Sequence, residues 1–509
     1  MMRWPIALAL VLAGSACTTV ETGAVQLDLS LPPSGGLRPV GMTTVAITEI
    51  QPDGTSVVST TELEGDGDSM HFSAGDVAVG TSITLAAELR DSTGRLVGYG
   101  EVDTPITPSA TKTVTVTIPV RKPIVFVASA MPVTTIDPTR YSIDPMYQGT
   151  ITQNALIVVP IDGNDVAVVS QSSVQLLATA TDSPDGKSIA ITGTPTDAAA
   201  VPGQRQLVVG TSNGITLVDF GSGTATAITA MAADRVAVGG TDELGYTAYV
   251  LSGRVAPPEG VMASCSGSST VQAIALAGGG APAQVATGKQ LADIAADGTG
   301  VFGADPCAGK VTRLDSGGSL TLSLPGAASV AVQHETLWAA GSQAPSMQNG
   351  QPVGAYIVLA SINTDGMSSN TTDLPPKAEI MQYDDDSSFT FARTMRADTE
   401  VPIDLAVLPT GDQVALIARM DSHQDALYDE GTGQKAVPQM DVTVDDVVLV
   451  DPTTTALTRI RTNCDLTVTG SSGSEFPDWS CQPATDGGAL TPPGGQYTPS
   501  SVDAVYGSR

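Results

Sequence analysis

Between residues 25 and 120 the chain alternates apolar and polar positions in short runs separated by turn-forming residues. Alternation with a period of two predicts strands that bury one face, and no run in this region carries a helical period. The clearest runs lie at 25–31, 43–50, 55–63, 82–89, 95–102 and 112–120. The first part of the chain is therefore predicted to be all-β.

About seven short strands within about 100 residues is the pattern of a β-sandwich. The architecture resembles immunoglobulin-like or transthyretin-like domains, and we expect such a sandwich at residues 24–122. Domains of this kind commonly act as spacers or adhesive modules, so a spacer role is expected here.

From residue 123 onwards one motif recurs: an apolar strand, a turn, a second apolar strand, then a third strand that ends in Asp. The copies are spaced by about 40 to 65 residues, with insertions, and repeats of this period indicate a repeat architecture. The clear copies cover 176–192 with 205–228, 290–326, 329–341 with 354–366, and 402–420 with 445–460, and a weaker copy covers 233–286.

A four-stranded antiparallel sheet cannot bury both of its faces alone, and radial stacking of such sheets buries them in a β-propeller. The sequence predicts a propeller over 123–509 with six blades, or alternatively seven. The run at 500–507 is expected to be the first strand of a blade whose remaining strands are 123–129, 155–162 and 166–171. Strands from the two ends of the propeller segment would then share one blade and close the ring.

The repeat Ser183-Pro184-Asp185-Gly186-Lys187 and the strand after it resemble the TolB-like propeller repeat, in which an Asp-Gly turn joins the two inner strands. The YVTN and NHL repeat families share this organisation. The resemblance covers the repeats and implies a propeller; it does not cover the insertions between them.

Residues 1–16 have the form of a signal peptide: Arg3 is followed by an apolar run and by small residues before Cys17. The segment resembles a bacterial lipoprotein signal, which implies cleavage before Cys17, lipidation of Cys17, and a tether at 17–23. Gly14 stands where that family prefers Leu, so ordinary secretion is the alternative. Thr18 after the cysteine favours, by the family's sorting rule, the outer membrane or the cell surface.

Cysteine usage fits an exported chain. Five cysteines are present, and assigning Cys17 to lipid leaves Cys265, Cys307, Cys464 and Cys481. Four cysteines outside the cytosol allow three pairings. We expect Cys265–Cys307 and Cys464–Cys481, because each pair lies within one stretch of repeats.

Charge narrows the range of partners. The chain has 23 Lys and Arg against 53 Asp and Glu, a net charge of −30. Nucleic-acid binding needs a basic surface, so we do not expect this protein to bind nucleic acid.

The chain contains 53 Gly and 34 Pro, which is a high content. In an all-β repeat protein these residues mark turns rather than disorder.

Candidate binding residues lie in the insertions. Tyr141, Tyr147, Trp479 and Tyr497 hold most of the aromatic surface of the long Pro- and Gly-rich loops, and such loops on a rigid scaffold commonly carry binding. Asp384, Asp385 and Asp386 form an acidic run that could supply oxygen ligands to calcium. A solvated loop explains the same run.

No nucleophile motif is present, and His71, His334 and His423 lie far apart in the sequence. The expected function is therefore non-enzymatic: a lipid-anchored surface protein whose propeller binds protein or glycan, without a cofactor. The alternatives are a lactonase-like or lyase-like propeller hydrolase with a channel calcium, and a periplasmic assembly factor. A ring of three or four carboxylates or histidines in the channel would favour the hydrolase.

Overall fold

The computed structural model describes residues between 22 and 507, with its longest gaps at 32–41, 144–154, 256–265, 429–434, 470–478 and 482–498. Every regular element in the described part is a β-strand, which confirms the all-β prediction. No helix among these residues is long and apolar enough to cross a membrane. The chain divides into two compact units, Met1–Arg121 and Lys122–Arg509.

The first unit contains two sheets that share one core. One has the order β4-β1-β7 and the other the order β3-β2-β5-β6. Their strands are β1 (Thr22–Ser30), β2 (Met42–Ile50), β3 (Ser56–Glu62), β4 (Ser69–Ala78), β5 (Thr84–Asp91), β6 (Leu96–Glu101) and β7 (Val114–Pro119). Alternate residues such as Leu27, Leu85 and Ile118 are fully buried in this core, as the period of two predicts.

One strand of the first unit was not predicted. β4 lies between the predicted strands 55–63 and 82–89 and pairs antiparallel with β1 from Ser69 to Ala78. Its sequence, SMHFSAGDVA, is rich in small and polar residues. The apolar signal that marks the neighbouring strands is therefore weak in β4, and its pairing depends on β1.

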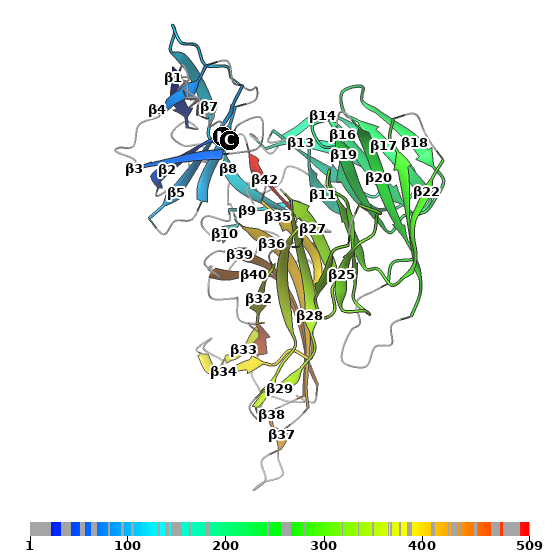
Figure 1. Ribbon diagram of the computed structural model, residues 1–509. Coiled ribbons are helices and arrows are strands. Elements are labelled where there is room, and N and C mark those ends of the chain that lie inside the picture. The colour runs from blue at the N-terminus through cyan, green and yellow to red at the C-terminus, as the bar shows by residue number, and fades with distance from the viewer. Residues whose placement is uncertain are drawn as a thin grey trace, which may run out of the picture. The chain divides into compact units, whose positions relative to one another are not determined.

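The second unit repeats one sheet (Figure 1). Its described residues form seven four-stranded antiparallel sheets. Six of them are built from strands consecutive in the chain, apart from inserted hairpins: β11–β14, β15–β18, β19–β22, β23–β26, β27-β28-β31-β32 and β35-β36-β39-β40. The repeated sheets confirm the predicted propeller architecture.

The strands of these six sheets have the following bounds: β11 (Ile157–Pro160), β12 (Asp165–Val169), β13 (Ser173–Ala178), β14 (Ser183–Ala190), β15 (Pro195–Ala200), β16 (Gln206–Thr211), β17 (Gly214–Asp219), β18 (Thr224–Thr229), β19 (Arg235–Thr241), β20 (Gly245–Ser252), β21 (Ser269–Ala275), β22 (Ala283–Lys289), β23 (Asp293–Ala296), β24 (Val301–Asp305), β25 (Lys310–Arg313), β26 (Thr321–Ser323), β27 (Ser329–Gln333), β28 (Thr336–Gln343), β31 (Tyr356–Asn363), β32 (Ser369–Leu374), β35 (Thr399–Val407), β36 (Val414–Gln424), β39 (Gln439–Asp451) and β40 (Ala456–Thr469).

The seventh sheet joins segments from the two ends of the unit. It has the order β10-β9-β8-β42, with β8 (Lys122–Ser129), β9 (Thr134–Asp137), β10 (Ser142–Ile143) and β42 (Pro499–Gly507). β42, red in Figure 1, pairs antiparallel with β8 along its length. The predicted pairing of 500–507 with 123–129 is therefore present.

The other strands predicted for this closing sheet were wrong. Residues 157–160 and 165–169 belong to the next sheet as β11 and β12. The closing sheet instead uses β9 and β10, which lie in the segment predicted to be an irregular Pro-rich insertion. These two strands are four and two residues long, so they carry almost no periodic signal.

The Asp-Gly turn predicted at Ser183–Lys187 was also wrong. These residues lie inside β14, the outermost strand of its sheet, where Asp185 pairs with Leu176 beside a register shift. Gly186 has a φ of +71°, which glycine adopts at little cost and which fits a bulge within a strand. The predicted repeat 176–192 with 205–228 therefore spans two sheets.

The innermost strands form a closed ring. β11 contacts β15, and contacts continue through β19, β23, β27, β35 and β42 back to β11. Separate apolar cores fill the spaces between neighbouring sheets. Val209 of β16 packs with Val169 of β12 in one of them, and Trp338 of β28 packs with Leu416 of β36 in another.

Insertions between the strands of the larger sheets form three small sheets of their own in the described residues. β29 (Ser346–Gln348) pairs with β30 (Gln351–Val353), and β37 (Leu427–Tyr428) pairs with β38 (Lys435–Val437). A further sheet has the order β34-β33-β41, from β33 (Ala378–Tyr383), β34 (Phe389–Met395) and β41 (Trp479–Cys481). This sheet joins insertions that are about ninety residues apart in the sequence.

Candidate functional site: the central channel

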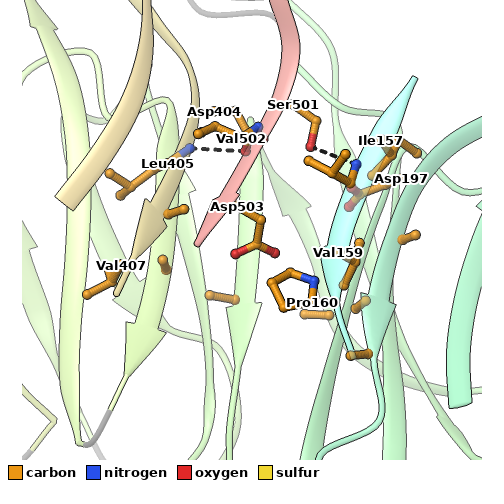
Figure 2. A pocket seen from close by; sticks show the side chains of 18 of the residues that line it. Ile157, Val159, Pro160, Asp197, Asp404, Leu405, Val407, Ser501, Val502 and Asp503 are labelled. Atoms are coloured by element: carbon orange, nitrogen blue, oxygen red, sulfur yellow. Dashed lines mark hydrogen bonds between the residues drawn. The ribbon is translucent and has the colours of Figure 1, made fainter. Parts of the chain in front are cut away.

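A cavity of about 520 Å³ lies inside the ring of innermost strands (Figure 2). All seven inner strands line it: β11, β15, β19, β23, β27, β35 and β42. Most of its lining residues are Ala, Val, Ile or Leu, and the ionisable ones are Asp197, Asp404 and Asp503. The volume lies within the range of small-molecule sites, which are mostly apolar with a few polar groups.

Carboxylates on the inner strands hold neighbouring sheets together. Asp197 Oδ2 on β15 accepts a hydrogen bond from the backbone N–H of Val236 on β19, at 2.7 Å. Asp293 Oδ2 on β23 accepts one from Val330 on β27, at 2.9 Å. The backbone N–H of an inner strand faces the next sheet, so an acceptor on that sheet satisfies a donor that would otherwise be buried without a partner.

The same link closes the ring on β42. Asp404 Oδ2 on β35 accepts from the N–H of Val502 at 2.9 Å, and Asp404 Oδ1 accepts from Leu405 at 3.0 Å. Ser501 Oγ on β42 lies 3.5 Å from the N–H of Val158 on β11 (Figure 2). Both oxygens of Asp404 are therefore engaged by the backbone.

Asp503 differs from these carboxylates. Its Oδ1 accepts from the N–H of Ala504 at 2.8 Å, and no described residue donates to its Oδ2. Asp503 stands two residues beyond Ser501, and Pro160 stands two residues beyond Val158 on the neighbouring strand. Proline has no N–H, so β11 cannot donate there. Figure 2 shows the Asp503 carboxyl beside Pro160 in the cavity.

Burial raises the pKa of each carboxyl group that lines the channel above the ordinary value for Asp. Burial and the nearby Asp404 together raise the pKa of Asp503 to about 8, although the hydrogen bond from the N–H of Ala504 opposes the shift. Burial likewise raises the pKa of Asp197 to about 7 and that of Asp404 to about 6, while Arg235 opposes both shifts. At neutral pH Asp503 is therefore largely protonated, because a charge in apolar surroundings is unfavourable.

Arg235 neutralises one end of the channel. It lies at the start of β19, with its Nε 3.3 Å from Asp293 Oδ1. Burial alone would lower the pKa of Arg235, but the charges of Asp197, Asp293 and Asp404 outweigh it and raise the pKa. Arg254 lies near it and donates to the carbonyl of Ala292 at 2.7 Å. The carboxylates at this level are thus held by a guanidinium and by backbone amides.

This arrangement is a poor metal centre. In the described part of the chain, no group of three or more His, Cys, Asp or Glu side chains is arranged to hold a metal ion. Backbone N–H groups engage both oxygens of Asp404. The channel therefore offers two carboxyl groups, Asp197 and Asp503, that each have one oxygen not engaged by the backbone, in a lining that is otherwise mostly apolar.

A second buried charged cluster lies within the sheet that contains β35 and β40. Arg459 Nη2 lies 2.8 Å from Glu400 Oε1, and Arg461 Nε lies 3.1 Å from Asp446 Oδ1. Glu400 is fully buried, which raises its pKa to about 7, although Arg459 opposes the shift. The pair is shielded from solvent, so it stabilises one packing arrangement rather than offering a site.

Most of the site residues predicted from the sequence lie outside the described residues: Cys17, Cys265, Tyr141, Tyr147, Tyr497, Asp384, Asp385 and Asp386. Trp479 is the first residue of β41 and pairs with Gln382 of β33. The roles expected of the aromatic and acidic residues therefore stay predictions.

The described cysteines lie in different settings. Cys464 is buried on β40, and Cys307 lies in the turn between β24 and β25. Both cysteines interact with another residue, and no described contact identifies which residue that is. The predicted pairing stays a prediction.

Two of the three histidines lie among the described residues, in different units. His71 lies in β4 of the first unit. His423 lies at an exposed position near the end of β36, with Nδ1 2.5 Å from Asp441 Oδ1 and Nε2 3.2 Å from Asp425 Oδ1. These two hydrogen bonds raise the pKa of His423, that to Asp441 most strongly.

Neither the protein-family models nor the curated proteins contain a match to this chain. Solved structures that share part of the arrangement include a nidogen/laminin complex, at 10% identity over 50% of this chain and 94% of the other, with a TM-score of 0.34. The WD40 domain of Neurospora crassa Pan2 matches at 12% identity over 54% and 89%, with a TM-score of 0.33. A Lactobacillus plantarum protein matches at 12% identity over 71% and 99%, with a TM-score of 0.34. Since all three scores are below 0.5, the propeller assignment rests on the sheets of this chain.

Proposed function

We propose that this protein is an exported, lipid-anchored scaffold in which a β-sandwich carries a seven-bladed propeller that binds a protein or glycan partner without catalysis. The seven four-stranded sheets and their closed ring support seven blades rather than six. The two sheets of the first unit share one core, which supports the sandwich.

The observation that carries the binding role is the extra sheet β34-β33-β41. It is formed by insertions from two separate parts of the repeat array, and β41 begins with Trp479. Insertions that pair with each other present a fixed surface, and a fixed surface loses less conformational entropy on binding than a free loop. Aromatic residues on such surfaces commonly anchor partners.

A photo-crosslinking amino acid placed at position 479 tests this role in intact cells. We expect a discrete crosslinked product with one envelope component from position 479. Position 244 is the control, since Leu244 is 87% exposed and precedes β20 in a different sheet. Equal or absent crosslinking at the two positions would contradict the proposal.

The lipid anchor is proposed from the residues that precede Cys17. Two or three acyl chains hold a protein stably on a membrane, whereas one chain is marginal. Metabolic labelling with a palmitate analogue is expected to mark the wild-type chain and to leave Cys17→Ser unlabelled. An unlabelled wild-type chain that migrates with the variant would remove the anchor from the proposal.

The disulfides Cys265–Cys307 and Cys464–Cys481 are proposed alongside it. β40, which carries Cys464, contacts β41, which ends at Cys481, and this contact supports the second pair. Peptide mapping without reduction should recover both cross-linked peptides. A peptide joining Cys307 to Cys464 would contradict the pairing.

The three carboxyls that line the channel are the feature expected of the hydrolase alternative. Backbone amides, however, engage both oxygens of Asp404 and one oxygen each of Asp197 and Asp503. The assembly-factor alternative gains no specific support. Their arrangement favours holding the ring together over activating water. We therefore keep the non-enzymatic role as the proposal.

A further inference from the structure

The channel contains one level at which a single carboxyl group faces only apolar neighbours. The hydrogen bonds from Val236, Val330, Val502 and Val158 fix the relative heights of the inner strands. The level of Asp503 lies one residue beyond these donors and two residues beyond their acceptors Asp197, Asp293, Asp404 and Ser501. The other residues at this level all line the cavity: Val159, Ala199, Ala237, Ala295, Ala331 and Ala406.

Asp503 is not needed to join the sheets. Asp197, Asp293 and Asp404 each accept a backbone N–H from the next strand, whereas the strand next to Asp503 presents Pro160 at the corresponding place. The Oδ2 atom of Asp503 therefore remains available towards the cavity (Figure 2). A carboxyl group in this position costs stability, and the hydrogen bond described for it comes from Ala504 on its own strand rather than from a neighbouring strand.

We propose that the channel binds a small alkylammonium ion, with its alkyl part against the Ala and Val side chains and its ammonium group on Asp503 Oδ2. The cavity of about 520 Å³ is large enough for an amine with several carbon atoms. A primary ammonium supplies the N–H donors that Pro160 cannot supply. The net charge of −30 also favours the approach of cations over anions.

The charged groups around Asp503 favour a monovalent cation. Asp404 lies next to it on β35, and Asp197 on β15 faces the same cavity. Arg235 and Asp293 stand at the level where the sheets are joined and compensate each other. On the neighbouring strands, β11 contributes no ionisable residue, and Lys122 of β8 pairs with Gly507, four residues from Asp503.

The pKa of Asp503 makes this binding pH-dependent. The empty site holds a proton up to about pH 8, and an ammonium ion needs the ionised carboxylate. Binding of the cation therefore releases a proton. The apparent affinity is expected to rise up to about tenfold per pH unit between pH 6 and pH 8.

The test uses n-hexylammonium, with n-hexanol and hexanoate as neutral and anionic probes of similar length, in isothermal titration calorimetry of the full chain. We expect saturable binding of n-hexylammonium alone, at least tenfold tighter at pH 8 than at pH 6. Asp503→Asn should weaken it at least tenfold and remove the pH dependence, while Asp373→Asn, which neutralises an exposed carboxyl on β32, should not.

A second variant separates the cavity from the charge. Ala199→Leu fills the cavity without changing its charge, and it should weaken binding of n-hexylammonium while thermal unfolding remains cooperative. Three results would overturn the proposal: no saturable binding at pH 8, equal binding of n-hexanol, or unchanged binding by Asp503→Asn.

Discussion

At the scale of single residues, the inner-strand aspartates act as acceptors that join one sheet to the next. Asp293 is the most completely engaged of them: it accepts from Ile294 and Val330 and faces Arg235. Such a carboxylate stabilises the fold because its partners would otherwise be buried without a counterpart.

Asp293→Ala is expected to lower the free energy of unfolding by about 3–5 kcal/mol, since it leaves the Arg235 charge and the Val330 N–H unpaired. The matched control is Asp185→Ala, because Asp185 is half exposed and its ion pair with Arg205 at 3.3 Å lies at the surface. The control should change stability by about 1 kcal/mol or less. Urea titration of both variants measures the difference, and equal losses would contradict the structural role of Asp293.

The raised pKa values predict the direction of the pH dependence of stability. The pKa of Asp197, Asp404 and Asp503 is higher in the folded chain than the ordinary 3.8, so the folded state binds more protons between about pH 4 and pH 8. The free energy of unfolding should therefore fall as the pH rises from 5 to 8, by at least about 1 kcal/mol. Asp503→Asn should flatten this dependence, and a stability that rises over this range would contradict it.

At the scale of elements, the sequence predicted the strands whose apolar residues are regular and long. The inner strands and their partners were found because Val, Ile, Leu and Ala run through them, as in β36 and β39. The short strands β9 and β10 were not found, because their formation depends on pairing with β8 rather than on their own residues. Because the two-residue strand β10 is the fourth strand of the closing sheet, β11 and β12 belong to the next sheet.

The channel carboxyls were not predicted for a related reason. Asp197, Asp404 and Asp503 lie on strands of three different sheets, and no spacing along the chain brings them together. One sequence signal was available: Asp recurs within the inner strands, among apolar neighbours, where a charged residue is unexpected. The acidic run at Asp384–Asp386 is the more conspicuous pattern, although it lies outside the described residues.

The closing strand allows a direct test at this scale. Deleting residues 499–509 removes β42, which pairs with β8 and contacts β35 and β11. We expect loss of cooperative thermal unfolding of the whole second unit, because the ring then has two open edges. Deletion of residues 508–509 alone is the control. An unchanged melting temperature after the longer deletion would contradict closure.

At the scale of the whole molecule, the two units have separate cores. The core of the first unit draws on β1, β2, β5, β6 and β7, whereas the cores of the second unit lie between its sheets. Each unit contains the apolar contacts that its own strands need, so each is expected to fold alone.

Expression of residues 122–509 without the first unit should therefore give a chain with one cooperative transition at the melting temperature that it shows within the full protein. Differential scanning calorimetry of the full chain and of the fragment compares the two. A fragment that is insoluble, or whose transition is lower by more than about 5 °C, would show that the first unit contributes to the stability of the ring.

The position of β42 in the sequence also has a consequence for biosynthesis. The ribosome makes β42 after every other described strand. The edge of β8 that pairs with β42 therefore has no partner while several hundred intervening residues are made. Throughout that interval the growing chain exposes unpaired strand edges, which invite association with other chains. Folding of this unit is therefore expected to depend on protection of those edges until β42 has been made.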